Sequence, residues 1–261
     1  MPSTAPPEPL LDSRAPSAQN IAASVAAIQQ VHLASDAAEL LALLHEAVTA
    51  IGASAGVYVA VIPESASDDS VFSLFACEPQ FATEQAALGP IQQHPWVRFA
   101  QGHTLPATDQ QLPVLDTADA AAIQLAAKYG FKSYLVVPTG NGINLRRVEM
   151  LCIGCDQPAA FEGAGARAIW VLARSLASEL HDWLTLRLSQ SLRQDARLQA
   201  TDVQLLHMEW HGLSTKAISQ RTGLSIASVD SRFQRLNRKL NCRSRAASAQ
   251  RAAEYGLLEL P

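Results

Sequence analysis

Basic side chains gather in the last part of the chain, where they could bind a polyanion. From Leu198 onward the sequence holds nine Lys or Arg residues and five Asp or Glu residues. Because the whole chain of 261 residues carries a formal charge of −4, this tail contributes +4 and the remainder −8. A basic tail on an acidic body is the charge pattern of a protein whose tail meets nucleic acid.

One predicted helix concentrates these basic groups. It runs from Ile226 to about Leu240, with Ser225 as its N-cap. On a 3.6-residue period its polar side chains lie opposite its apolar ones, so the polar face can enter a major groove. We expect Arg232 and Arg235 to read base edges, because Arg makes bidentate contacts to guanine. The full set expected on this face is Ser228, Ser231, Arg232, Arg235, Arg238 and Lys239.

A shorter helix precedes this one. It is predicted over Thr215–Thr222, and the turn 223–225 contains a glycine. A short helix, a three-residue turn and a longer helix make a helix-turn-helix. Hydroxyls and a cation at its start should hold phosphates. These residues are Ser214, Thr215 and Lys216.

The rest of the chain must position this tail and supplies strands as well as helices. Apolar periodicity predicts helices over 17–34, 36–51, 118–130 and 163–192. Strands are predicted over 55–63, 71–77, 133–140 and 146–155, joined by short turns. Residues 80–117 contain four prolines and could form short helices or the wall of a cavity. Strands that follow one another through short turns favour an antiparallel sheet with helices on its faces.

The first 18 residues are rich in Pro, Ser and Ala and are expected to be a disordered lead. They lack the basic-then-apolar pattern of a signal peptide, and no apolar stretch reaches the ~20 residues that span a bilayer. The sequence therefore favours a cytoplasmic protein that is not bound to a membrane.

No set of residues assembles a catalytic or metal site. Cys152 and Cys155 form a C-x-x-C within a predicted strand, where a spacing of three places their side chains on opposite faces. His207 and His211 are one helical turn apart but lack a third ligand. We expect no enzyme activity, no metal and no cofactor. A purely protein-binding tail is the other class, and binding to duplex DNA without salt dependence would favour it.

The tail resembles the LuxR-type helix-turn-helix. The resemblance covers the whole tail, although Gln204 and Ala217 stand where Glu is common and Trp210 replaces a small residue. The matching residues are Leu198, Leu205, Leu206, Gly212, Ser214, Ile218, Ser225, Val229, Lys239, Leu240, Arg245 and the segment 255–258.

The body resembles the autoinducer-binding domain of the same family, most clearly in the segments 127–138 and 94–97. The resemblance implies an α+β protein: an α/β/α sandwich around an antiparallel sheet, then an all-α helix-turn-helix bundle. It implies homodimers on palindromic promoter sites in double-stranded DNA, and N-acyl homoserine lactones as family ligands. The expected domains are a lead (1–18), a sensor (19–186), a linker (187–199) and the DNA-binding domain (200–261).

The ligand-holding residues of that family are replaced in this chain. Where the family has Trp, Tyr and Asp, this sequence has Phe81, Gln85 and His94. Phe81 cannot donate a hydrogen bond, and one unpaired buried polar ligand group costs ~1–3 kcal/mol. Three hypotheses follow: another small molecule as signal, a collapsed pocket that acts without ligand, or ordinary lactone sensing with rearranged contacts. The expected ligand-facing residues are Tyr58, Phe75, Phe81, Gln85, His94, Trp96 and Ser133.

Overall fold

The computed structural model describes residues 18–64, 69–139, 145–163 and 165–258. The lead expected over residues 1–18 lies outside this range, apart from Ala18, which begins the first helix. None of the described helices is both long and apolar enough to cross a membrane.

The N-terminal domain is built on one sheet whose strands all pair antiparallel. The five strands lie in the order β2-β1-β5-β4-β3. Short connections join β1 to β2 and β4 to β5, which is why these pairs are sheet neighbours. The strands are β1 (Ala55–Pro63), β2 (Asp69–Ala76), β3 (Ala107–Thr108), β4 (Ser133–Thr139) and β5 (Val148–Cys155).

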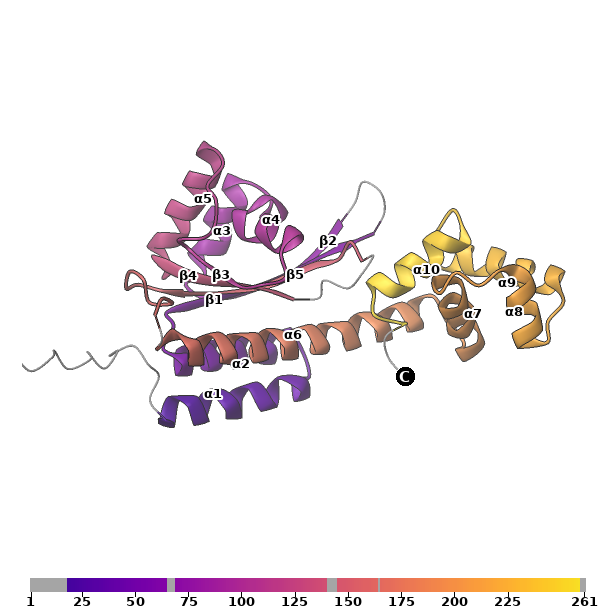
Figure 1. Ribbon diagram of the computed structural model, residues 1–261, viewed down its shortest axis with the longest axis horizontal. Helices are drawn as coiled ribbons and strands as arrows, with labels where there is room; N and C mark the ends of the chain where they lie inside the picture. Colours follow the sequence, from indigo (N-terminus) through magenta and orange to yellow (C-terminus); the bar gives the residue numbers. More distant parts are fainter. Residues whose placement is uncertain (1–17, 65–68, 140–144, 164, 259–261) are drawn as a thin grey trace, which may run out of the picture.

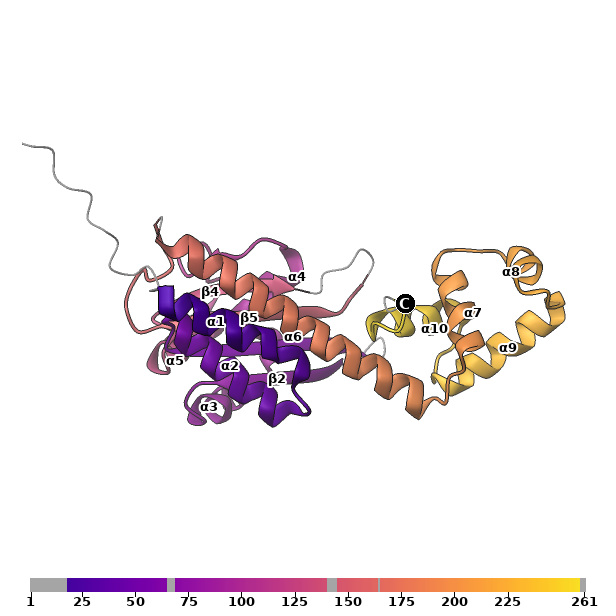
Figure 2. The ribbon, with the colours of Figure 1, turned by 90° about the horizontal axis from the view of Figure 1, so that it is seen from below.

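Helices cover both faces of the sheet (Figures 1 and 2). On one face lie α1 (Ala18–Gln30), α2 (Ala37–Ile51) and α6 (Ala166–Asp195), with the short 3-10 helix η1 (Val31–Leu33). Asp36 caps α2 by accepting the backbone N–H groups of residues 38 and 39, and Gly52 ends it in the left-handed conformation. Both caps follow from local residue preferences, because Asp is favoured as an N-cap and Gly in the left-handed conformation that ends a helix.

The other face carries α3 (Gln80–Leu88), α4 (Pro95–Gly102) and α5 (Thr117–Lys128), with η2 (Ile91–Gln93) between α3 and α4. The proline-containing segment 80–117 therefore holds two α-helices, a 3-10 helix and a short strand, and ends where α5 begins. The expected α/β/α sandwich around an antiparallel sheet is confirmed.

Strand alternation divides the domain into two apolar cores. Val57 and Val59 point to the α3–α5 side, whereas Tyr58 points to the side of α1, α2 and α6. Cys152 and Cys155 follow the same rule. Cys152 is buried on the α3–α5 side and Cys155 packs on the opposite side, both as free thiols.

The second domain is helical and follows α6 closely. Helix α6 continues unbroken to Asp195, so most of the segment expected to link the domains is helical. Four helices follow: α7 (Ala200–Trp210), α8 (Thr215–Thr222), α9 (Ile226–Lys239) and α10 (Arg245–Glu254). The all-α C-terminal bundle is confirmed.

Candidate functional site

Helices α8 and α9 form a helix-turn-helix with caps at both starts. The Ser214 hydroxyl accepts the backbone N–H of Ala217 at 3.3 Å, and the Ser225 hydroxyl accepts that of Ser228 at 3.2 Å. Between the helices Gly223 has a φ of 70°, a conformation that glycine adopts without strain. The buried face of α9 consists of Val229, Phe233 and Leu236.

The opposite face of α9 is open to solvent at the end of the molecule farthest from the sheet (Figure 1). Ser231 and Arg235 are exposed, and Arg232 is half-buried at the edge of the apolar face. Within the described residues neither arginine has an ion pair. Lys216, at the start of α8, is also exposed. This surface can place two guanidinium groups in a groove without first breaking an internal contact.

Other residues expected to contact DNA already have partners in the protein. The Lys239 ammonium lies 2.9 Å from the Asp202 carboxylate and 3.0 Å from the Arg197 carbonyl oxygen. The Thr215 hydroxyl accepts a hydrogen bond from Arg245 at 2.7 Å. These contacts hold α9 and α10 against α7 and α8, so both side chains have a structural role here.

A cluster of aromatic rings fills the space between the sheet and α3–α5. Trp96 is fully buried at its centre, with ring centroids 4.3 Å from His94, 4.9 Å from Phe131 and 6.4 Å from Phe81. Phe81 also contacts Phe75 edge-on at 5.9 Å. The structure thus brings together four of the expected ligand-facing residues: Phe75, Phe81, His94 and Trp96. We call this group of rings the aromatic cluster.

Three buried polar atoms at or beside the aromatic cluster lack a hydrogen-bond partner among the described residues. They are Oε1 of Gln85, Nε2 of His94 and Nε1 of Trp96, the last of which faces the Tyr134 hydroxyl without good hydrogen-bond geometry. Gln85 lies one helical turn beyond Phe81 on the buried side of α3. Buried polar groups are normally paired, so three such atoms in one region mark a place able to bind a polar ligand.

His94 is held as a neutral hydrogen-bond donor. Its Nδ1 accepts the backbone N–H of Trp96 at 3.3 Å as the cap of α4, which leaves the hydrogen on Nε2. Burial, helped by the positive charge of Arg98 and opposed by the negative charge of Asp119, lowers the pKa of His94 to about 3. At neutral pH the free Nε2–H can therefore donate and carries no net charge.

Tyr58 and Ser133 lie apart from the aromatic cluster. The Tyr58 hydroxyl donates to Glu149 at 2.5 Å on the α6 side of the sheet. The Ser133 hydroxyl donates to the Gln157 carbonyl oxygen at 2.6 Å. The structure does not bring these two residues together with the other expected ligand-facing residues, because strand alternation turns them to the opposite face.

Sequence reasoning missed a polar contact that joins the two domains. The buried carboxylate of Glu254, at the end of α10, accepts the backbone N–H groups of Arg146 at 2.8 Å and Arg147 at 2.7 Å. Nearby, Arg251 donates to the Glu64 carboxylate at 2.5 Å. The partners are more than 100 residues apart, so no local pattern could have identified them.

A cluster of buried polar side chains lies under α6 next to this contact. The fully buried Glu149 binds Tyr58, Arg147 and His181, the last at 2.9 Å. Arg147 also donates to the Thr185 hydroxyl at 3.0 Å. Arg147 therefore connects the interior of the sensor domain to α10.

A comparison with protein families identifies the C-terminal part of the chain. Residues 196–252 match the family described as bacterial regulatory proteins, luxR family. No curated protein matches the chain by sequence. The C-terminal domain is thus a LuxR-type helix-turn-helix domain.

Solved structures share the fold of both domains. Escherichia coli SdiA is 12% identical, with a TM-score of 0.65 over 90% of this chain and 97% of that chain. SdiA in complex with octanoyl-rac-glycerol is also 12% identical, with a TM-score of 0.64 over 90% of this chain and 95% of that chain. The N-acylhomoserine lactone-dependent LuxR-family transcription factor CepR2 from Burkholderia cenocepacia is 15% identical, with 0.52 over 66% and 99%. The C-terminal domain therefore matches the luxR family of bacterial regulatory proteins, and most of the chain shares the fold of SdiA.

Proposed function

We propose that this protein is a sequence-specific transcriptional regulator that binds palindromic promoter sites in double-stranded DNA as a homodimer. The exposed basic face of α9 carries this proposal. Arg232 and Arg235 reach base edges, while Ser214, Lys216 and Arg238 lie beside the phosphates. A homodimer with two-fold symmetry matches a palindromic DNA site, because each subunit reads one half of the site.

The N-terminal domain, in this proposal, responds to a small molecule other than an acyl homoserine lactone. The site is the aromatic cluster with its three unpaired polar atoms. His94 and Trp96 each offer a hydrogen-bond donor, and Gln85 offers an acceptor. The ligand that fits has two acceptor groups and one donor, on a flat or apolar frame that packs between aromatic rings.

The state of His94 argues against a lactone ligand. In the family that the sequence resembles, the residue at this place is an Asp that accepts the ligand's amide N–H. Here the free nitrogen of His94 carries a hydrogen, so an amide N–H would meet another donor. The lactone reading remains the alternative and requires the amide to find another acceptor.

Action without ligand is the second form of the proposal, and the packing of the rings supports it. Phe81 contacts four other rings, with centroid distances from 5.6 to 6.4 Å. Aromatic packing of this kind stabilises a core with no ligand present. In this form the unpaired polar atoms lower the stability of the fold, and the packing of the rings offsets this loss.

Mass spectrometry of small molecules that co-purify with the protein from its native cells tests the proposal. A bound molecule with the stated hydrogen-bonding groups supports the ligand-responsive form. Soluble, folded, DNA-binding protein with nothing bound supports the ligand-free form. Obligate dependence of folding on an added acyl lactone would overturn both forms.

A further inference from the structure

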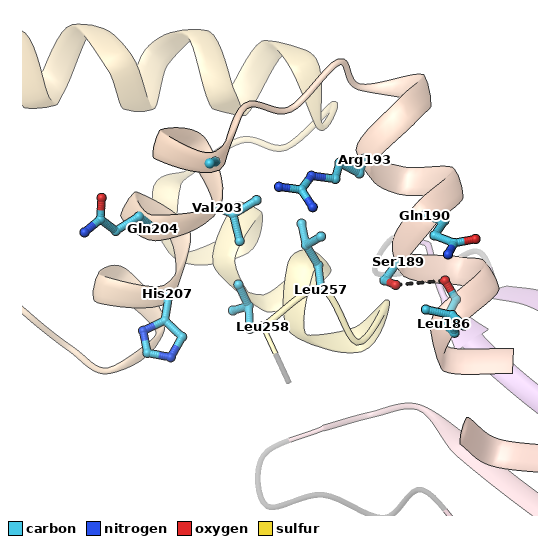
Figure 3. A pocket seen from close by; sticks show the side chains of 10 residues that line it. Leu186, Ser189, Gln190, Arg193, Val203, Gln204, His207, Leu257 and Leu258 are labelled. Atoms are coloured by element: carbon cyan, nitrogen blue, oxygen red, sulfur yellow. Dashed lines mark hydrogen bonds between the residues drawn. The ribbon is translucent and has the colours of Figure 1, made fainter. Parts of the chain in front are cut away.

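A pocket lies between the two domains, apart from the aromatic cluster. Its volume is about 680 Å³, and its walls come from α6, α7 and the segment after α10 (Figure 3). Ligand pockets fall in the range of about 300–1,000 Å³ and are frequent at domain interfaces. Its size and place therefore suit a small molecule.

The wall of the pocket is apolar on several sides. Leu186 projects from α6, Val203 from α7, and Leu257 and Leu258 from the C-terminal segment. Leu186 is 41% exposed, which is high for a leucine, so a bound ligand could cover it. An apolar chain lying here would remove Leu186, the most exposed of these side chains, from water.

Among the described residues that line this pocket, Arg193 is the one arginine or lysine, and His207 also lies in the wall. Arg193, on α6, extends its guanidinium toward Val203 and Leu257 (Figure 3). Within the described residues it has no ion pair, whereas Arg147, Arg245 and Arg251 each bind a carboxylate. Arginine binds a carboxylate through two parallel hydrogen bonds, so it is suited to this anion.

We propose that this pocket binds a medium-chain carboxylate, with the acid group on Arg193 and the hydrocarbon chain along the leucines. Charge complementarity selects the anion, and the apolar wall selects the chain. Such a ligand touches the C-terminal end of α6, which leads from the first domain to the second, and α7 of the second domain. Its binding therefore favours the arrangement of the two domains seen here.

Isothermal titration calorimetry on the full chain tests the proposal with three probes: decanoate, 1-decanol and acetate. Decanol has the chain without the charge, and acetate has the charge without the chain. Each buried methylene strengthens binding roughly fourfold, so acetate should bind too weakly to detect. Losing a charged hydrogen bond should weaken decanol by about tenfold to a hundredfold relative to decanoate.

Three variants locate the site. Arg193→Gln should weaken decanoate by about tenfold or more, and Leu186→Ser should weaken decanoate and decanol alike. Arg174→Gln, an exposed position earlier on α6, is the matched control and should bind as the wild type does. Arg193 and Leu186 are both exposed, so both variants should keep the melting temperature of the unliganded protein. Absence of decanoate binding, equal binding of decanol, or unchanged affinity in Arg193→Gln would overturn the proposal.

Discussion

The Glu254 carboxylate accepts the backbone N–H of Arg147 at 2.7 Å, across 107 residues of sequence. This bond joins the end of α10 to the approach to β5. Arg147 continues inward to Glu149, and Glu149 to Tyr58. A series of buried polar contacts therefore connects the C-terminal domain to the interior of the N-terminal domain.

Glu254→Ala should lower the free energy of unfolding by about 2–5 kcal/mol, because the backbone N–H groups of Arg146 and Arg147 lose their buried partner. Urea denaturation of the full chain measures this change. Glu46→Ala removes an exposed carboxylate and should change stability by less than about 0.5 kcal/mol. Equal, small effects of the two substitutions would show that the interdomain contact contributes little.

Arg232→Ala and Arg235→Ala should each cost about 1–3 kcal/mol of binding free energy on the preferred duplex and relax its sequence preference. Gel-shift titrations on preferred and altered duplexes measure both effects. Arg174→Ala, in the sensor domain, provides the control. Unchanged affinity and preference in both variants would refute the assignment of these two residues as base readers.

Lys239→Ala should weaken binding to all duplexes about equally, as the loss of a phosphate contact does. The slope of log K against log salt should become shallower by about one. Because Lys239 also binds Asp202 at 2.9 Å on a partly exposed surface, the free energy of unfolding should fall by only about 1 kcal/mol or less. A loss confined to one sequence would make Lys239 a base contact instead.

His181 should make the protein less stable as pH rises above about 6.5, the pKa of a histidine in the unfolded chain. Burial disfavours its charged form, but the hydrogen bond and negative charge of Glu149 outweigh burial and raise the pKa of His181. Tyr58, Arg147 and Asp182 are the other charged or titratable groups near this pair. A raised pKa contributes stability that is fully present below about pH 6.5 and is lost as pH rises through the folded value.

The measurement compares urea denaturation of wild type and His181→Gln between about pH 6 and pH 9. The wild type should lose more stability over this range than the variant. His45→Gln, at an exposed position on α2, should follow the wild type. Parallel curves for wild type and His181→Gln would contradict the linkage.

His94 should stay neutral across the physiological range. With its pKa near 3, its ring resonances in NMR spectra should not shift between about pH 8 and pH 5. Because the unfolded chain takes up this proton below about pH 6.5, His94 removes stability as pH falls. Titration of the His94 ring near pH 6 would contradict the donor role given to Nε2.

Much of the fold follows from local patterns in the sequence. Apolar periodicity, Asp36 as a cap and Gly52 as a stop predict α2 within one residue at its start. The third residue of the turn, Ser225, sets the start of α9. In the segment 80–117 the prolines obscure α4, because Pro95 occupies the first turn of that helix, where proline is tolerated.

The sites depend on contacts that local patterns do not reveal. Strand alternation alone separates Tyr58 from the neighbouring valines, yet it does not say which face holds the aromatic cluster. The pairing of Lys239 with Asp202 and of Glu254 with Arg147 requires the packed structure. Which residues bind DNA or ligand therefore stays a prediction.

Selection of duplexes from a random pool by the full-length protein, followed by salt titration, tests the central claim most directly. We expect an enriched palindromic sequence, and we expect the logarithm of its binding constant to fall linearly with the logarithm of the salt concentration. The Arg232→Ala/Arg235→Ala double variant should lose this enrichment. A pool that stays random after selection, or binding that does not depend on salt, would contradict it.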